Sequence, residues 1–329
     1  TICLLFLNYF LNYLMIKSFI KGGDYMKYVL ETFDIMKRYK HSIVLEKLNM
    51  HVPNGSIYGL IGRNGAGKTT LIRLLCGLQQ LTSGEYKIYG IKNTDRKICE
   101  VRKRIGAIIE TPSICMDMTA KDNLKEQYRI VGLPNYDGID DLLKLVGLEN
   151  TGKKTVKHFS LGMKQRLGIA IALVGSPDIL ILDEPINGLD PEGIIEIREL
   201  ILKLNKEKRI TFIISSHYLD ELSKIATCYG FINEHKIVKE IDRDELEKKF
   251  RKRIILNVSN LNECVRYLEE NGLSYKVISD ESIEIYEKLN ISEFVIALSK
   301  RNCNINNFQE KGESLENYYL NLIGGAKND

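Results

Sequence analysis

A run of eight residues combines small residues with one lysine and one hydroxyl group. Residues 62–69 read Gly-Arg-Asn-Gly-Ala-Gly-Lys-Thr and fit the pattern G-x-x-x-x-G-K-[ST]. Glycines at these positions let the backbone turn tightly, so that successive N–H groups can point at phosphate oxygens. Lys68 is then placed to reach the terminal phosphates of a nucleotide, and the Thr69 hydroxyl to ligate Mg²⁺. A glycine-rich turn with an incidental lysine is the alternative interpretation.

Two adjacent carboxylates end a strongly apolar run further along the chain. The residues 179–182 are all aliphatic, as expected for a strand buried on both faces, and Asp183 and Glu184 follow directly. Ligands of open α/β sheets bind at the carboxyl ends of strands, where the glycine-rich loop also lies. We therefore predict that Asp183 holds Mg²⁺ with Thr69 and that Glu184 polarises the attacking water. Taken alone, such a pair is more often a strand that meets a loop; the glycine-rich loop favours the functional interpretation.

Four further segments occur in an order that resembles one protein family. Residues 159–166, Phe-Ser-Leu-Gly-Met-Lys-Gln-Arg, resemble the LSGGQ signature of ABC ATPases and precede the Asp183 strand. Residues 187–190, Asn-Gly-Leu-Asp, resemble the D-loop of that family, and His217 follows the next strand as its switch histidine does. Tyr39 stands where the family places the aromatic residue that stacks on adenine. The resemblance spans about residues 26–240.

The resemblance implies an ATP-binding, ATP-hydrolysing subunit of an ABC transporter. The expected fold is an α/β P-loop core with an antiparallel β subdomain and an inserted helical subdomain. Two copies of the chain should sandwich two ATP molecules, and permease subunits on separate chains should form the channel, which places this subunit on the cytoplasmic side of the membrane. Motif and resemblance together assign ATP contacts to Tyr39, Gly62, Arg63, Asn64, Gly65, Ala66, Gly67, Lys68, Thr69, Thr70, Ser160, Gly162 and Asp190, and catalysis to Glu184, His217 and Glu110.

Three of these residues also have a purely structural interpretation. Ser160 can serve as the N-cap of the helix that follows it. His217 can be a capped or buried histidine, and Tyr39 a residue of a sheet. The functional interpretation is preferred because the segments follow one another in the order of the family.

Two positions depart from the common pattern of the family. Leu161 replaces a glycine of the signature, while Ser160 and Gly162 keep the residues expected to meet the γ-phosphate. Glu110 stands where the Q-loop usually has glutamine, which adds a negative charge and removes an amide donor. We predict that Glu110 acts near Mg²⁺ or in coupling to the membrane partner; an exposed loop residue is the alternative. Both departures, and the tail over 313–320, resemble the subgroup that exports peptide antibiotics such as bacitracin and lantibiotics.

The pattern of apolar residues locates the elements that position these side chains. It predicts strands around a turn over 28–50, a buried strand over 56–61 and a helix over 68–75. A helix over 191–208 and a buried strand over 210–214 follow the Asp183 strand, which indicates an α/β sheet with parallel neighbours. Helical patterns fill much of 119–173.

The pattern changes after residue 240. Strands are predicted over 253–258, 275–278 and 283–286, and helices over 261–271 and 291–300. We therefore expect an ABC ATPase domain over 26–240 and a small α+β accessory domain over 241–329.

Composition excludes several classes of protein. The 329 residues include 47 Lys and Arg against 43 Asp and Glu, and a net charge of +4 is too small to indicate a nucleic-acid partner. A basic run over 248–253 is interpreted as a solvated helix face, with a phosphate- or membrane-binding patch as the alternative. The seven cysteines have no C-x-x-C spacing, which argues against a zinc site and a disulfide framework.

Residues 1–25 differ from the rest of the sequence. Their apolar run over 2–7 is interrupted by Asn8 and Asn12, so it is short against the roughly 20 residues of a membrane span. The five residues before Met26, Lys-Gly-Gly-Asp-Tyr, can be encoded by a ribosome-binding sequence upstream of a start codon. We expect residues 1–25 to be a translated leader that is not native, with the native start at Met26.

Three other functions are alternatives to transport. A single-core ABC ATPase that acts in translation is the main alternative, although such proteins usually carry two cores in one chain. A DNA-repair ATPase would need a long coiled coil between the two halves of the core, and residues 69–159 show no sustained heptad pattern. Intact Lys68, Asp183 and Glu184 argue against a regulator that binds ATP without hydrolysing it.

Overall fold

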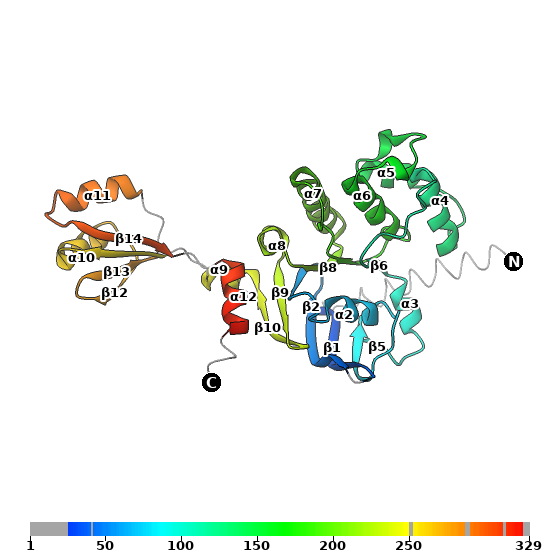
Figure 1. Cartoon of the computed structure of the whole chain (residues 1–329), viewed down its shortest axis with the longest axis horizontal. Coiled ribbons are helices and arrows are strands. Elements are labelled where there is room, and N and C mark those ends of the chain that lie inside the picture. Colours follow the sequence, from blue (N-terminus) through cyan, green and yellow to red (C-terminus); the bar gives the residue numbers. More distant parts are fainter. Residues whose placement is uncertain (1–25, 41, 250–252, 287–289, 312–313, 325–329) are drawn as a thin grey trace. The chain divides into compact units, whose positions relative to one another are not determined.

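The structure is a computed structural model that describes residues 26–40, 42–249, 253–286, 290–311 and 314–324 (Figure 1). The predicted leader over 1–25 and part of the basic run over 248–253 lie outside the described residues. The chain divides into two compact units. The first runs to Tyr218 and resumes over Lys224–Glu240, and the second comprises Leu219–Ser223 and the residues from Ile241 onward.

A four-stranded antiparallel sheet begins the first unit. Its strands are β1 (Tyr28–Tyr39), β2 (Ser42–Pro53), β4 (Ser83–Ile88) and β5 (Ile91–Lys92), in the order β2-β1-β4-β5. β1 and β2 pair over almost their whole length, and their buried residues pack on the same core as the helix that follows the glycine-rich loop. The two strands predicted within 28–50 are confirmed.

A six-stranded sheet forms the centre of the first unit. Its strands are β3 (Ile57–Ile61), β6 (Ile105–Ile108), β7 (Ile179–Asp183), β8 (Thr211–Ser216), β9 (Cys228–Asn233) and β10 (Lys236–Asp242), in the order β10-β9-β3-β8-β7-β6. β3, β7 and β8 are buried at every residue and pair in parallel, which explains their continuous apolar sequences. Because they are parallel neighbours, their carboxyl ends meet at one edge of the sheet.

Two helices of the first unit start at this edge. Helix α2 (Lys68–Leu75) follows β3 and buries its aliphatic side against the core, and α7 (Pro191–Lys208) follows β7. α7 has Asp190 as its N-cap and Pro191 in its first turn, where proline needs no hydrogen-bond partner. Both predicted helices are confirmed, as is the α/β class. A short helix, α3 (Ile98–Arg102), precedes β6.

The segment between β6 and β7 is a group of packed helices (Figure 1). It contains α4 (Ala120–Val131), α5 (Ile139–Leu145) and α6 (Leu161–Ala172), with short 3₁₀ turns at Glu149–Thr151 and Val156–His158. Thr119 caps the start of α4 by accepting from the Asp122 N–H, and Gly132 ends it in the left-handed region. α6 packs directly on β6, since a Cβ added to Gly106 would lie 2.2 Å from the Ala172 carbonyl oxygen.

The second unit has its own sheet and its own core. Its strands are β11 (Arg253–Val258), β12 (Tyr275–Ser279), β13 (Ser282–Ile285) and β14 (Ile305–Lys311), in the order β12-β13-β11-β14. Its helices are α9 (Arg243–Lys249), α10 (Leu261–Glu270), α11 (Ile291–Ser299) and α12 (Leu315–Gly324), and it includes residues Leu219–Ser223 of α8 (Leu219–Ile225). All three strand pairs are antiparallel. Five of these elements match the sequence predictions. β14 and α12 were not predicted; β14 is an edge strand with mostly polar residues. α9 contains the first two residues of the basic run over 248–253, which was interpreted as a helix face. Among the described residues, no helix has both the length and the apolar character needed to cross a membrane.

Candidate active site

The loop over residues 62–67 joins β3 to α2, and two of its glycines lie against other strands. Gly67 has a φ of 103°, and a Cβ added to it would lie 2.7 Å from the Val44 carbonyl oxygen. A Cβ on Gly62 would lie 2.3 Å from a side-chain carbon of Ile232. Side chains at these positions would therefore force the loop to move. Since Gly67 is the N-cap of α2 and has no capping side chain, the first N–H groups of α2 can serve an anion.

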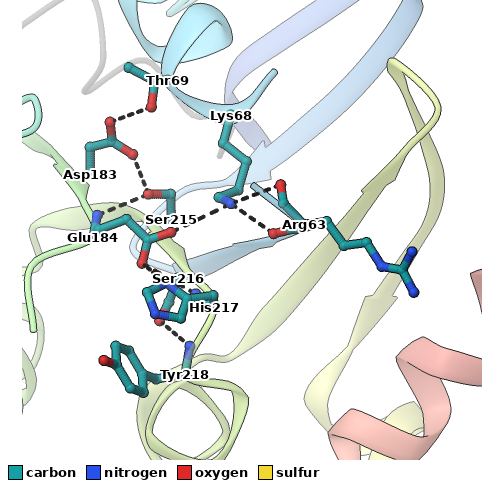
Figure 2. A network of polar contacts seen from close by, with 10 residues as sticks. Arg63, Lys68, Thr69, Asp183, Glu184, Ser215, Ser216, His217 and Tyr218 are labelled. Atoms are coloured by element: carbon teal, nitrogen blue, oxygen red, sulfur yellow. Dashed lines mark hydrogen bonds and ion pairs between the residues drawn. The ribbon is translucent and has the colours of Figure 1, made fainter. Parts of the chain in front are cut away.

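Lys68 is buried at the start of α2, with 5% of its side chain exposed. Its Nζ donates to the carbonyl oxygen of Gly62 at 2.7 Å and to that of Arg63 at 3.4 Å. The same Nζ lies 3.5 Å from Glu184 Oε1 (Figure 2). A buried ammonium group needs such partners, since desolvation without them is costly. These contacts fix the positive charge between the loop and the carboxylate that ends β7.

Asp183 is the last residue of β7 and is 2% exposed. Its Oδ2 accepts from the Thr69 hydroxyl at 2.7 Å, and its Oδ1 accepts from the Ser215 hydroxyl (Figure 2). Both donors bond the carboxylate oxygens, which compensates the burial of this polar group. The three side chains come from α2, β7 and β8, so the parallel register of these elements creates the cluster.

Glu184 is held on both its backbone and its carboxylate. Its φ of 51° lies in the left-handed region, and its N–H donates to Ser215 at both the carbonyl oxygen and the hydroxyl. The carboxylate Oε2 lies 2.7 Å from His217 Nδ1 and accepts from the His217 backbone N–H at 3.3 Å (Figure 2). One carboxylate oxygen of Glu184 therefore faces the imidazole of His217, and the other faces Lys68. The backbone bonds to Ser215 and the left-handed conformation fix this orientation.

The other residues predicted to contact ATP lie outside this hydrogen-bonded cluster, apart from the Arg63 carbonyl oxygen, which accepts from Lys68. Tyr39 ends β1 with its ring exposed; its hydroxyl donates to the Gln79 side-chain oxygen, and the Lys37 ammonium lies 4.9 Å from the ring centroid. An exposed ring is able to stack on a base. In the loop, Arg63, Asn64 and Gly65 are exposed and Ala66 is half-buried. Thr70, in the first turn of α2, is also half-buried.

Ser160, Gly162 and Asp190 lie at the starts of two helices. Ser160 is the N-cap of α6, and its hydroxyl accepts from the Met163 N–H at 3.2 Å. Asp190 caps α7 in the same way, through the Gly193 N–H. The structural interpretation of Ser160 as a cap is therefore correct. Because Ser160 and Asp190 are also exposed, capping leaves both free to meet a second molecule.

The two departures from the common family pattern lie in different surroundings. Leu161 is 52% exposed at the start of α6, and its Cδ2 would lie 3.3 Å from a Cβ added to Gly188. The start of α6 and the loop before α7 are thus in contact. Glu110 is 61% exposed and accepts a hydrogen bond from Arg73 Nη2 at 2.6 Å. Its carboxylate is directed to α2 in this structure, and not to Asp183 or Thr69.

The side chains that meet at this edge have the chemistry that a nucleoside triphosphate and Mg²⁺ require. Phosphate oxygens need N–H donors and positive charge, which the loop, the start of α2 and Lys68 supply. Magnesium takes few protein ligands, usually oxygen atoms, and completes its shell with water and phosphate. Thr69 Oγ1 and Asp183 Oδ2 are such oxygen atoms and lie within hydrogen-bond distance of each other. The donor set therefore fits both groups.

Sequence reasoning did not single out Ser215 or Arg73 as site residues. The register of β7 and β8 pairs Asp183 with Ser215, so a polar residue at the end of the apolar run over 210–214 was the available signal. Arg73 lies four residues after Thr69, which puts both side chains on one face of α2. That spacing was visible in the sequence, but the pairing of Arg73 with Glu110 was not.

The fold and the site define a nucleotide-binding protein of the P-loop class. A family model described as "ABC transporter" matches residues 45–187. The chain is 42% identical over 304 residues to the bacitracin transport ATP-binding protein BcrA of Bacillus licheniformis, covering 92% of this chain and 99% of that one. It is 45% identical over 230 residues to the lantibiotic transport ATP-binding protein SrtF of Streptococcus pyogenes, covering 69% and 98%. The chain belongs to the family of ABC transporter ATP-binding proteins.

Solved structures agree with this assignment. The cbiO1 protein of Clostridium perfringens, part of an ABC transporter complex, superposes with a TM-score of 0.61 at 27% identity and covers 74% of this chain and 95% of that one. A dimeric ATP-binding cassette in a post-hydrolysis state with ADP and phosphate gives a TM-score of 0.59 at 24% identity, covering 65% and 98%, and shows a shared fold. The predicted family, and the resemblance to the subgroup with bacitracin and lantibiotic transport proteins, are confirmed.

Proposed function

We propose that this ATP-binding subunit hydrolyses ATP with Mg²⁺ to drive the export or expulsion of a peptide antibiotic, of the bacitracin or lantibiotic kind, through membrane subunits on separate chains. The cargo follows from relatives that carry these names over most of the chain. The observation that carries the hydrolytic activity is the joined cluster of Lys68, Thr69, Asp183 and Glu184. It combines phosphate binding, metal ligands and a base at one edge of the sheet.

The loop over 62–67 and the start of α2 bind the phosphates. The N–H groups around Gly67 and the positive end of α2 face the phosphates, and Lys68 exchanges a carbonyl contact for the terminal phosphate oxygens. Thr69 and Asp183 hold Mg²⁺, which neutralises charge on the phosphate oxygens when bound. Asp183 stays oriented because Ser215 still donates to its other oxygen.

Glu184 acts as the general base. Its carboxylate accepts a proton from the attacking water, and its orientation depends on the contacts with His217 at Oε2 and the backbone bonds to Ser215. His217 is thus a positioning residue for Glu184 as well as a candidate contact of the terminal phosphate. Lys68 lies on the other side of the carboxylate and limits its movement.

The residues outside the cluster receive the remaining roles. Tyr39 stacks on the adenine, and Ser160, Gly162 and Asp190 face the nucleotide of a second copy of the chain. The exposure of Ser160 and Asp190 at the helix starts supports this assignment, as does the dimeric state of a solved cassette of the same fold, whereas Gly162 is buried in this single chain. We assign nucleotide binding to residues 26–240 and an accessory role to 241–329. Glu110 belongs to the coupling with the permease, which keeps the subunit at the cytoplasmic face of the membrane.

The proposal is tested with the full chain and its membrane partners. The purified subunit should release phosphate from ATP in the presence of Mg²⁺. Co-expression with the permease genes that accompany it should raise the resistance of a sensitive host to bacitracin or to a lantibiotic, and Glu184→Gln should abolish the increase. Hydrolysis without any change in resistance to peptide antibiotics would retain the ATPase and overturn the proposed cargo. Absence of hydrolysis by the wild-type complex would overturn the catalytic proposal.

A further inference from the structure

The connection between β8 and α8 contains two aromatic rings in contact. β8 ends at Ser216 and α8 begins at Leu219, so His217 and Tyr218 form the connection. Their ring centroids lie 4.2 Å apart, and the ring planes are tilted by 38° (Figure 2). Successive side chains of an extended strand point to opposite faces, so the contact requires the chain to turn after β8.

The hydroxyl of Ser216 accounts for this turn. Ser216 is 2% exposed, and its Oγ accepts a hydrogen bond from the Tyr218 N–H at 2.9 Å (Figure 2). A serine oxygen that accepts from the N–H group two residues later closes a local turn of the backbone. The ring of Tyr218 is therefore placed against the imidazole by a bond that starts at the buried end of β8.

His217 has one side-chain bond to the catalytic cluster. Its Nδ1 lies 2.7 Å from Glu184 Oε2, and among the described residues no protein group bonds its Nε2. The torsion that turns an imidazole about its bond to Cβ is broad, and the His217 side chain is 39% exposed. A single bond at Nδ1 therefore leaves the plane of the ring free to tilt, and a second contact is needed to direct Nε2.

We propose that Tyr218 is a positioning residue for His217 in ATP hydrolysis. Its ring holds the plane of the imidazole, so that Nδ1 stays on Glu184 while Nε2 faces the terminal phosphate. The inference rests on the proposed function, in which Glu184 takes the proton of the attacking water. Within the described part of the chain, nothing bonds the Tyr218 hydroxyl, so the aromatic ring carries the role.

Two substitutions separate the ring from the hydroxyl. Tyr218→Phe keeps the ring, and Tyr218→Leu removes it. The matched control is Tyr136→Leu, because Tyr136 is 43% exposed against 39% for Tyr218 and its ring also contacts a second ring, that of Tyr128. All variants are made in the full chain and assayed with Mg-ATP.

Tyr218→Leu should lower kcat by about threefold to tenfold, which is the range expected for the loss of one contact between aromatic rings. The affinity for ATP should stay within about twofold of wild type, because only an orientation needed for the chemical step is lost. Tyr218→Phe and Tyr136→Leu should keep wild-type kcat. An unchanged kcat in Tyr218→Leu, or an equal fall in Tyr218→Phe, would overturn the inference.

NMR spectroscopy of the protein with labelled histidine tests the ring contact without reference to activity. The ring current of Tyr218 shifts the imidazole resonances of His217, which are identified by their loss in His217→Gln. They should stay in place in Tyr218→Phe and move in Tyr218→Leu. Resonances that do not move in Tyr218→Leu would overturn the inference. Shifted resonances in a wild-type protein that does not hydrolyse ATP would overturn the proposed function instead.

A double variant tests whether Tyr218 acts through His217. His217→Ala removes the imidazole, so adding Tyr218→Leu should cause no further fall in kcat, because residues that act as one unit are not additive. Multiplication of the two effects would overturn the inference. The melting temperature of Tyr218→Leu should stay close to that of Tyr218→Phe. A large fall for the leucine variant alone would show that the ring supports the fold, and would also contradict the proposal.

Discussion

The Thr69 hydroxyl lies 2.7 Å from Asp183 Oδ2, although 114 positions separate the two residues in the chain. The contact exists because β3 and β7 both pair with β8 in parallel, so the helix after β3 and the last residue of β7 reach the same edge. It joins the glycine-rich loop to the carboxylates in one site.

Glu184→Gln should reduce ATP hydrolysis by about 100-fold or more, because an amide cannot accept the proton of the attacking water. Binding of Mg-ATP should persist, and the variant should accumulate as an ATP-bound dimer in size-exclusion chromatography. Phosphate release is the main measurement. Glu199→Gln, an exposed change on the adjacent helix α7, is the matched control and should retain activity. Near-normal hydrolysis by Glu184→Gln would remove the residue from the role of base.

Lys68→Ala should weaken ATP binding by about 10-fold to 100-fold, because the phosphates lose a charge-assisted partner worth roughly 1.5–3 kcal/mol. The loss of the buried ammonium also leaves the Gly62 carbonyl oxygen without its donor. Isothermal titration measures the effect. Lys203→Ala, on the exposed side of α7, removes the same charge and should bind as the wild type does. A titration curve equal to that of wild type for Lys68→Ala would move the phosphate site elsewhere.

Removal of Mg²⁺ with EDTA should stop hydrolysis, and Asp183→Asn should raise the Mg²⁺ concentration for half-maximal activity by about tenfold or more. An amide oxygen is a weaker ligand than a carboxylate, and its N–H₂ group opposes the donors Thr69 and Ser215. ATP binding measured in EDTA should change little. An unaltered Mg²⁺ dependence in Asp183→Asn would assign the metal to other residues.

Glu110→Gln should leave ATP affinity within a few-fold of wild type but reduce peptide-antibiotic resistance more than it reduces ATPase activity. The substitution removes the charge-assisted bond to Arg73 while the Lys68 cluster stays intact. Resistance is measured in cells that carry the complete transporter, alongside ATPase rates of the purified subunit. Wild-type values in both assays would show that Glu110 is an exposed loop residue without a special role.

The cysteines should differ in reactivity by location. Burial raises the pKa of the Cys264 and Cys76 thiols to about 12, whereas Cys99 and Cys115 are exposed. The thiolate is the reactive form, so at pH 8.5 a maleimide should label Cys99 and Cys115 in the native protein, and Cys264 only after denaturation. Since these thiols ionise in the unfolded chain near pH 8.5, the free energy of unfolding should fall as pH rises above that value. Rapid native labelling of Cys264, read by mass spectrometry, would contradict its burial.

The sequence by itself determined the elements that hold the site, and it did so where local patterns are strong. The helix over 191–208 has a proline at its first turn and an apolar stripe, and the strand over 179–182 is wholly aliphatic, so both could be located without tertiary information. The glycine-rich loop could also be assigned, because a tight turn before a buried helix tolerates few residue types at Gly62 and Gly67. In contrast, β14 escaped prediction because an edge strand needs no apolar alternation.

Only the tertiary structure decided which side chains meet. Ser215 bonds Asp183 because two strands are neighbours in the sheet, and Glu184 faces His217 because its backbone is held in a left-handed conformation. The pairing of Glu110 with Arg73 depends on where the end of β6 lies relative to α2. Hydrogen bonds and ion pairs act over a few ångströms, while local patterns specify each element separately. The sequence therefore shows which chemical groups are available, and the packing of the elements determines which of them are in contact.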